Sequence, residues 1–289
     1  MPIEIVYGSA RPNGLVQFTF ANPVVQYTIG IRAFTMTYGV EDHWIQSLAI
    51  KILPVQNASV GATSNQVSAH IEMTMQDCSG NRIKVADSEI WPVCIAVTGS
   101  TEHNTVFGSA IGVSSNTSPN VAMPPLGDGY TISTCFQSGF NLTFTSKDHQ
   151  IRRAHALLGF EDGQISPSAG MDDSSGNNVQ VATVDAGYIA SSYPTPGIVA
   201  TPISKQTTTP FPVSLTEAAK AAVALIQNWN VEFPHVHNLQ KIEVGSFGDP
   251  TWTGNVVTVQ SCYAHMCDTS GNIQDDSNSS CDMVVIATT

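Results

Sequence analysis

The chain has 289 residues, of which 42% are hydrophobic and 12% are charged, so its polarity comes mainly from Ser, Thr, Asn and Gln. Eleven basic residues stand against 23 acidic ones, which gives a net charge of −12. Because phosphate contacts need clustered Lys or Arg, this balance argues against nucleic acid and anionic membranes as partners.

The length exceeds the usual single domain of about 100 to 200 residues, so two or three domains are expected. Residues 1–14 have no basic start followed by an apolar run, and no apolar stretch approaches the roughly 20 residues of a membrane span. We therefore expect a soluble protein with no membrane insertion and no classical signal peptide. Its location stays unknown, and a virion or an extracellular site reached by a non-classical route fits this pattern.

Three copies of one pattern begin with a short strand. Each strand starts with an aromatic residue, at Phe34, Phe140 and Trp229. Hydrophobic and polar residues alternate along it, which is typical of a strand with one buried face. A histidine follows each strand, at His43, His149 and His237. Apolar residues at regular positions after each histidine predict a second strand.

Each copy continues with the motif Met-x-Asp-x-Ser-Gly-Asn. Five fixed positions that recur in three places indicate an internal repeat. The Asp can accept backbone N–H bonds and the Gly supplies the positive φ that closes a short hairpin, so we predict a turn. A calcium site is the alternative, but the motif lacks the alternating oxygen ligands of calcium loops. The turn residues are Asp77, Gly80 and Asn81, then Asp173, Gly176 and Asn177, and finally Asp268, Gly271 and Asn272.

An Ile-Ala pair closes each copy at a nearly constant distance after the turn. The order of strand, turn, strand and closing Ile-Ala resembles that of H-type lectin domains, which are small sandwiches that associate as trimers. The Trp that commonly precedes the closing pair in that family is absent, since Cys94, Tyr188 and Val285 stand at this position.

The predicted fold is all-β, with three tandem, diverged, antiparallel β-sandwich-like units. The units span residues 1–107, 129–190 and 213–289, and the second is shortened because its strand before the turn has decayed. Segments rich in Ser, Asn, Pro, Gly or Thr, at 108–128 and 191–212, are predicted to be linkers.

One short α-helix is predicted before the third unit, over residues 214–229. Ser214 followed three residues later by Glu217 matches a capping box, and alanine-rich helix formers come next. We expect this helix to pack against the third unit.

The six cysteines are irregularly spaced and include no C-x-x-C pair, which argues against a zinc site. Cys78 with Cys94, and Cys267 with Cys281, flank the same kind of turn. Disulfides and buried free thiols both remain open for these pairs.

No sequence motif of a hydrolase, a phosphate-binding loop, a zinc protease or a dinucleotide-binding enzyme is present. We therefore predict no catalytic residue, cofactor or metal. An Asp–His dyad is not expected at Asp42 and His43, because neighbours on a strand point to opposite faces. A pseudo-threefold closure of the units is the alternative that brings three histidines to one metal. We favour histidines on exposed loops that satisfy backbone groups.

Loop Asp and His residues beside a Trp can hold a sugar, so the surroundings of the histidines and two tryptophans are candidates for ligand or partner binding. These residues are Asp42, His43, Trp44, Asp148, His149, His235, His237 and Trp252.

Three functions are weighed. A non-enzymatic structural subunit of a virion, tail or extracellular filament ranks first, because the copies share cores and turns but differ in their long loops. It predicts self-association as the main partnership. A multivalent, lectin-like, carbohydrate-binding adhesion protein is the alternative, with glycans as partners. An enzyme of unrecognised class is third.

Overall fold

The computed structural model describes residues 3–55, 64–99, 105–114, 121–122, 130–161, 164–173, 175–192, 197–274 and 277–289. Within these residues it is all-β, with antiparallel strands and one three-residue 3-10 helix, Val85–Asp87 (η1). The prediction of an all-β protein is confirmed.

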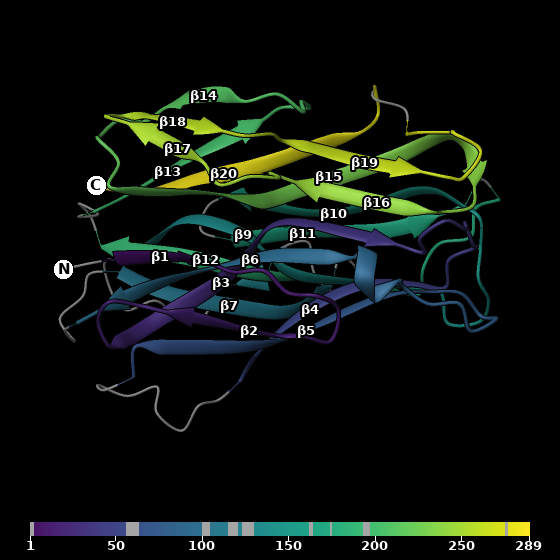
Figure 1. Ribbon diagram of the computed structural model, residues 1–289, viewed down its shortest axis with the longest axis horizontal. Helices are drawn as coiled ribbons and strands as arrows, with labels where there is room; N and C mark the ends of the chain where they lie inside the picture. Colours follow the sequence, from purple (N-terminus) through teal and green to yellow (C-terminus); the bar gives the residue numbers. More distant parts are fainter. Residues whose placement is uncertain are drawn as a thin grey trace.

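The strands recur in the same order in three repeats (Figure 1). Repeat 1 comprises β1 (Ile3–Tyr7), β2 (Leu15–Thr19), β3 (Val24–Thr37), β4 (Ser47–Val55), β5 (Gln66–Gln76) and β6 (Glu89–Thr98). Repeat 2 comprises β7 (Thr105–Ser114), β8 (Val121–Ala122), β9 (Tyr130–Thr143), β10 (Ile151–Glu161), β11 (Gln164–Asp172) and β12 (Val181–Ser192). Repeat 3 comprises β13 (Ile198–Ser204), β14 (Phe211–Ser214), β15 (Ala221–His237), β16 (Lys241–Gly245), β17 (Thr251–Thr253), β18 (Val256–Val259), β19 (Tyr263–Cys267) and β20 (Ser280–Thr288).

The three main sheets each combine strands of two repeats. Sheet I has the order β1-β6-β3-β16-β19, sheet II has β2-β5-β4-β9-β12-β7, and sheet III has β13-β20-β15-β10-β11-β8. A small fourth sheet, β14-β18-β17, belongs to repeat 3 alone. Three independent sandwiches are therefore not confirmed. The predicted unit boundaries stay predictions, but β8 and β13 lie within the segments that were predicted as linkers, and β7 extends into one of them. The strand before the second turn, predicted as decayed, is present as β11.

The same seam joins the repeats in each main sheet. The long strand β3 of repeat 1 pairs with β16 of repeat 3, β9 of repeat 2 with β4 of repeat 1, and β15 of repeat 3 with β10 of repeat 2. The register is equivalent each time, because the repeat aromatic lies opposite Val244, Ile50 or Ala156. The repeats thus close a ring in which each one pairs with the other two.

The predicted helix over residues 214–229 is wrong. Residues 211–214 form β14, and most of the alanine-rich stretch lies in β15, which is held between β20 and β10. Ala222 and Ala224 point to the main core, Val223 and Leu225 point to the opposite face, and all four are completely buried. A central strand with two buried faces accepts a continuous apolar run, and this environment overrides the helix propensity of alanine.

Aromatic residues from all three repeats meet in the core. The ring centroids of Phe34 and Phe140 are 5.5 Å apart, and those of Trp229 lie 6.0 Å and 5.2 Å from them. All three side chains are at most 1% exposed. The closing Ile-Ala pairs are buried as well, with the isoleucines in a smaller cluster and the alanines in the main core. This two-sided burial explains why both residues recur in the sequence.

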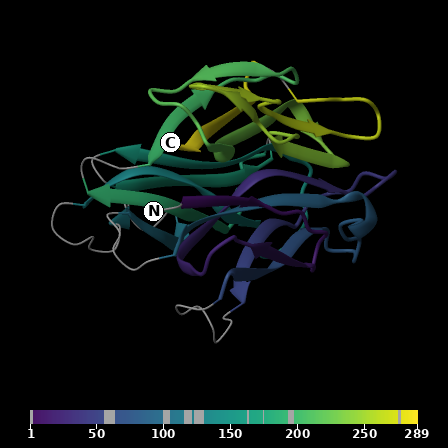
Figure 2. The same cartoon turned by 60° about the vertical axis from the view of Figure 1, so that its left-hand side comes forward.

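The two termini lie at one end of the molecule (Figure 1). The hairpin turns that contain the repeated motif lie at the opposite end. Figure 2 shows the green and yellow strands of repeat 3 layered over the strands of the other two repeats.

Candidate functional site

The repeated motif forms the same turn three times. In repeat 1 the backbone N–H groups of Ser79 and Asn81 both donate to Oδ1 of Asp77, each over 2.9 Å, and the Asn81 amide donates to Oδ2 over 2.6 Å. Asp173 and Asp268 accept the equivalent bonds in repeats 2 and 3 over 2.6–3.0 Å.

The motif glycines have φ angles of +100°, +85° and +85°. L side chains rarely adopt such angles, so glycine fits these positions. The Asp, Gly and Asn of each motif are therefore placed as a turn requires. Both carboxylate oxygens of each motif Asp accept hydrogen bonds from N–H groups, as in a turn rather than a cation site.

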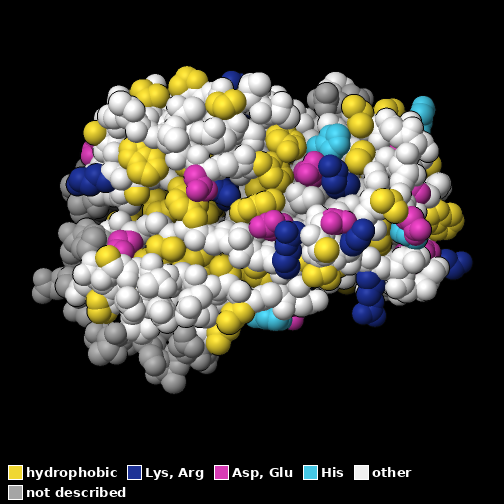
Figure 3. Space-filling model, viewed as in Figure 1, with side chains coloured by type: hydrophobic (Ala, Val, Ile, Leu, Met, Phe, Trp, Pro, Cys, Tyr) yellow, Lys and Arg dark blue, Asp and Glu magenta, His cyan; other side chains and the backbone are white. Residues whose placement is uncertain are grey.

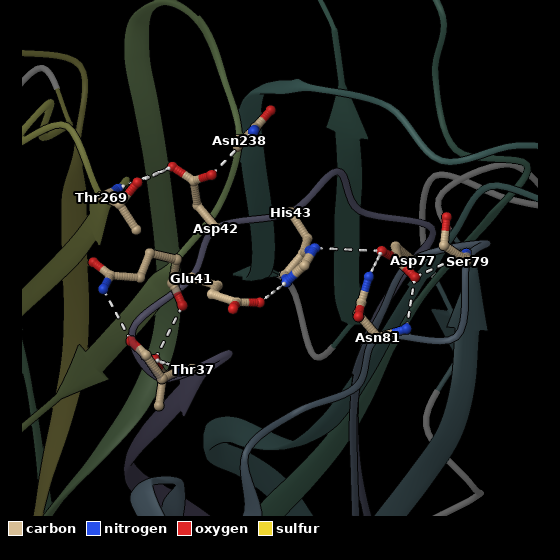
Figure 4. Close-up of polar contacts among 11 residues, drawn as sticks. Thr37, Glu41, Asp42, His43, Asp77, Ser79, Asn81, Asn238 and Thr269 are labelled. Carbon is tan, nitrogen blue, oxygen red and sulfur yellow. Dashed lines mark hydrogen bonds and ion pairs between the residues drawn. The ribbon is translucent and has the colours of Figure 1, made fainter.

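Each repeat histidine lies against the motif Asp of its own repeat (Figure 4, repeat 1). The distance from Nδ1 of the histidine to Oδ2 of the Asp is 3.5 Å for His43, 3.0 Å for His149 and 3.1 Å for His237. The imidazole rings also contact Tyr38, Phe144 or Phe233, which lie at or near the ends of β3, β9 and β15, with centroid distances of 4.3–5.0 Å. Each histidine thus contacts both the turn and a strand of its repeat. Of each histidine side chain, 19–23% is exposed.

Aspartates next to two of the histidines reach the turn of another repeat. Asp42 of repeat 1 accepts bonds from the N–H and hydroxyl of Thr269, over 3.0 Å and 2.6 Å, in the turn of repeat 3. Asp148 of repeat 2 accepts a bond from the N–H of Cys78 in the turn of repeat 1, over 3.1 Å. Repeat 3 has Val236 at this position. These carboxylates link the turns of different repeats.

A chain of side-chain amides extends this link. The Gln150 amide donates to Asn238 over 3.1 Å, and the Asn238 amide donates to Asp42 over 3.1 Å (Figure 4 shows the second bond). One residue from each repeat is thus joined at the turn end of the molecule.

Hydrogen bonds control the charge of these carboxyl groups. Burial works to raise the pKa of Asp77, but the bonds from Asn81 and Ser79 and the nearby His43 outweigh it and hold the pKa below its ordinary value. The same balance lowers the pKa of Asp173. The pKa of Asp42 is also lowered: burial works to raise it, but the hydrogen bonds from Thr269 and Asn238 outweigh that effect. All three groups are anionic at neutral pH.

Acid should weaken the turn end. A carboxyl with a lowered folded-state pKa stabilises the fold fully above its ordinary pKa, here 3.8, and loses this contribution as pH falls through the lowered value. We expect the urea midpoint to fall between about pH 5 and pH 2. A double variant, Asp77→Asn with Asp173→Asn, should be less stable at the upper pH and show a flatter profile. Equal slopes for the two proteins would contradict this assignment.

The three histidines do not form a metal site. In the described part of the chain, no group of three or more His, Cys, Asp or Glu side chains is placed to hold a metal ion. The alternative in which three imidazoles meet at one metal is therefore wrong. All six cysteines are free, and four of them are buried, so neither suggested disulfide is present.

The two candidate tryptophans lie on the surface, away from the aromatic core. Trp44 is 48% exposed and follows His43, whereas Trp252 is 38% exposed and lies on β17 in the small fourth sheet. His235 is exposed near the end of β15. The structure thus brings together the aspartates and histidines of the turn end, but it does not join them to Trp252.

Sequence reasoning missed the contact between each histidine and its motif Asp. Each repeat has one such histidine and one motif Asp, and this one-to-one occurrence was the signal that could have indicated the contact. It also missed a polar cavity beside β19, because no motif marks the segments that line it.

The fold and the turn end define an all-β protein of antiparallel sheets whose repeats are joined by shared sheets and carboxylate bonds. No protein-family model matches the chain, and no curated protein matches it. Among the residues described, no helix has the length and apolar character needed to cross a membrane.

Proposed function

We propose that the protein is a non-enzymatic structural subunit of a larger assembly, such as a virion, a tail or an extracellular filament or surface particle. The observation that carries this proposal is the ring of three repeats, closed in one register by shared sheets. A chain that completes such a ring alone is a rigid block that needs no partner to fold. The repeated Asp and His side chains support the same role, because they hold turns in place.

The surface suits contacts between copies. Figure 3 shows one face on which most of the surface is neither charged nor hydrophobic, with hydrophobic and charged side chains in separate groups. Copies with a net charge of −12 repel one another, so assembly requires contacts that avoid the acidic groups. The outer face of sheet II offers an apolar contact of this kind, and its Glu72 lies opposite Lys51 of the neighbouring strand.

Two leucines mark this face of sheet II. Leu15 on β2 and Leu53 on β4 both lie opposite His70 of β5, so they point to the same side. They are 64% and 41% exposed, and Val55, two residues further along the strand, is 38% exposed. An exposed apolar group of this kind is a suitable contact for a second copy of the chain.

Light scattering and negative-stain microscopy over a concentration series test the proposal. We expect particles, sheets or filaments that grow with concentration. Burying one leucine contributes about 1.5–3 kcal/mol, so a Leu15→Asp, Leu53→Asp double variant should associate at least about tenfold more weakly. Val40→Asp is the matched control, because Val40 is 82% exposed and lies outside sheet II. A wild-type protein that stays monomeric at every concentration would overturn the structural role.

A lectin-like adhesion protein is the second candidate. The exposure of Trp44 and Trp252 favours it, since a ring on the surface can stack on a sugar. However, Gln150 and Asn238 replace Trp44 in the other repeats, so three matching platforms are not available. A glycan array with Trp44→Ala and Trp252→Ala as comparison proteins distinguishes this candidate from the first.

A further inference from the structure

A polar cavity of about 550 Å³ lies beside β19, at one edge of sheet I. Ligand pockets usually occupy about 300–1,000 Å³, so it has the volume for a small molecule. Among the described residues, its lining comes from repeat 3 and includes Gln206, Thr207, Thr208, Glu243, Tyr263, Ala264, His265, Ile273 and Gln274.

The wall beside the sheet edge is held in place by strand-like bonds. The Gln206 side chain donates to the carbonyl of Ala264 over 2.7 Å and accepts from its N–H over 3.1 Å. Thr207 exchanges two backbone bonds with Cys262, over 2.7 Å and 2.9 Å. The Thr207 hydroxyl is itself paired with that of Thr209 over 2.9 Å, so this segment borders the cavity as a fixed wall.

Three side chains with binding chemistry share the floor of the cavity. Glu243 of β16 lies directly opposite His265 of β19, and Tyr263 is two residues before His265, so all three point to the same face of sheet I. The Tyr263 ring stacks on Phe247 at 5.1 Å, and Phe247 contacts Trp91 edge-on at 5.4 Å. A row of aromatic rings thus continues from the cavity across the sheet. Figure 3 shows hydrophobic side chains across the middle of the molecule in this view, with charged groups and histidine beside them.

The corresponding face of sheet II provides an internal comparison. Its registers place Ala49 where sheet I has Glu243, and Thr74 where sheet I has His265. Glu72 takes the place of Tyr263. A cavity there has a volume of about 180 Å³, and no aromatic residue is among its described lining residues. Sheet III has His155, Gly170 and Ser168 at the positions of Glu243, His265 and Tyr263. The combination of an aromatic ring, a carboxylate and an imidazole is therefore particular to sheet I and is not a consequence of the repeat.

This combination matches the chemistry of a neutral pyranose sugar. The C–H face of a pyranose packs on an aromatic ring, and its hydroxyls pair with a carboxylate, an imidazole and threonine hydroxyls. The described lining contains no Lys or Arg, and the nearby Lys241 is an ion-pair partner of Glu243 at 3.0 Å, so the lining does not favour an anionic sugar. Burial, and then the charge of Glu243, raise the pKa of Tyr263 to about 12, so its hydroxyl stays a donor at neutral pH.

We propose that this cavity is a binding site for a neutral pyranose sugar. Tyr263 is the stacking platform, and Glu243 and His265 bind the hydroxyls. The site does not depend on the structural role proposed above, because a subunit of an assembly can carry one glycan site on each copy.

The test uses the full chain and a panel of glucose, galactose, mannose, fucose, N-acetylglucosamine and N-acetylgalactosamine. Glucuronic acid and N-acetylneuraminic acid are the anionic comparisons. Saturation-transfer NMR detects binding, and calorimetry measures the affinity and the number of sites. We expect at least one neutral sugar to bind at one site per chain, with C–H protons of one ring face receiving the most saturation.

Two variants locate the site. Glu243→Gln removes a charged acceptor from a partly exposed position, and Tyr263→Ala removes the platform. Each should weaken the affinity about tenfold or more. Tyr263→Phe should retain most of the binding, because it keeps the ring. Glu72→Gln on sheet II is the matched control, and Trp252→Ala tests the rival platform; both should bind like wild type.

Thermal unfolding of each variant separates a lost site from a lost fold, and Glu243→Gln is the change least expected to alter the fold. The proposal is overturned if no neutral sugar in the panel binds, or if the anionic sugars bind in preference. It is also overturned if Glu243→Gln and Tyr263→Ala both keep the wild-type affinity for the sugar.

Discussion

Replacement of Trp229 by alanine is expected to destabilise the protein by about 3–5 kcal/mol. The side chain is completely buried and contacts Phe34 and Phe140 from the other two repeats. Its indole N–H also donates to Oε1 of Gln137 over 3.1 Å. The variant therefore leaves a cavity and removes the indole donor from a buried amide oxygen. Urea unfolding followed by far-ultraviolet circular dichroism measures the loss.

Trp252→Ala is the matched control for this experiment. The same residue type is deleted, but Trp252 is 38% exposed, so the free energy of unfolding should change by only about 0.5 kcal/mol. Because the aromatic cluster takes one ring from each repeat, Trp229→Ala should also keep a single unfolding transition. Two separate transitions in the variant, or equal losses for the two tryptophans, would contradict a core that is shared by the repeats.

The elements that could be predicted from the sequence are those whose signal is local. The alternation that begins at Phe34 and Phe140 identifies strands, because side chains of a strand alternate between faces. The motif around Asp77 identifies a turn, because the residue types match the backbone geometry. The stretch after Ser214 shows the limit of local signals: its capping box and alanines favour a helix, but burial on both faces makes most of the alanine-rich stretch part of β15.

The pairing between repeats could not be read in the same way. A period of two determines which face of a strand is buried, but it does not determine which strand lies beside it. The contact of His43 with Asp77 was missed for a related reason, since the number of residues between histidine and Asp differs from repeat to repeat. Glu243 and Tyr263 come together only through the register of β16 with β19.

Replacement of Gly245 by alanine is expected to destabilise the protein by about 3 kcal/mol or more. Gly245 is the last residue of β16, lies opposite Ala33 of β3, and has a φ angle of +113°. L side chains rarely adopt this angle. An added Cβ would also meet the carbonyl oxygen of Arg32 at less than a van der Waals contact, and this oxygen belongs to the backbone and cannot rotate away. Backbone strain and overpacking therefore add at one position.

Gly254→Ala separates these two costs. Gly254 has a φ angle of +59°, and no atom lies within 4 Å of the position of its Cβ, so only the conformational cost of about 1–2 kcal/mol remains. The difference between the two variants, measured by urea unfolding, reports how tightly β16 is packed against β3. This seam joins repeat 3 to repeat 1 and closes the ring. A Gly245 variant no less stable than the Gly254 variant would mean that the seam tolerates separation, and the closed ring could not then be the rigid block on which the structural role depends.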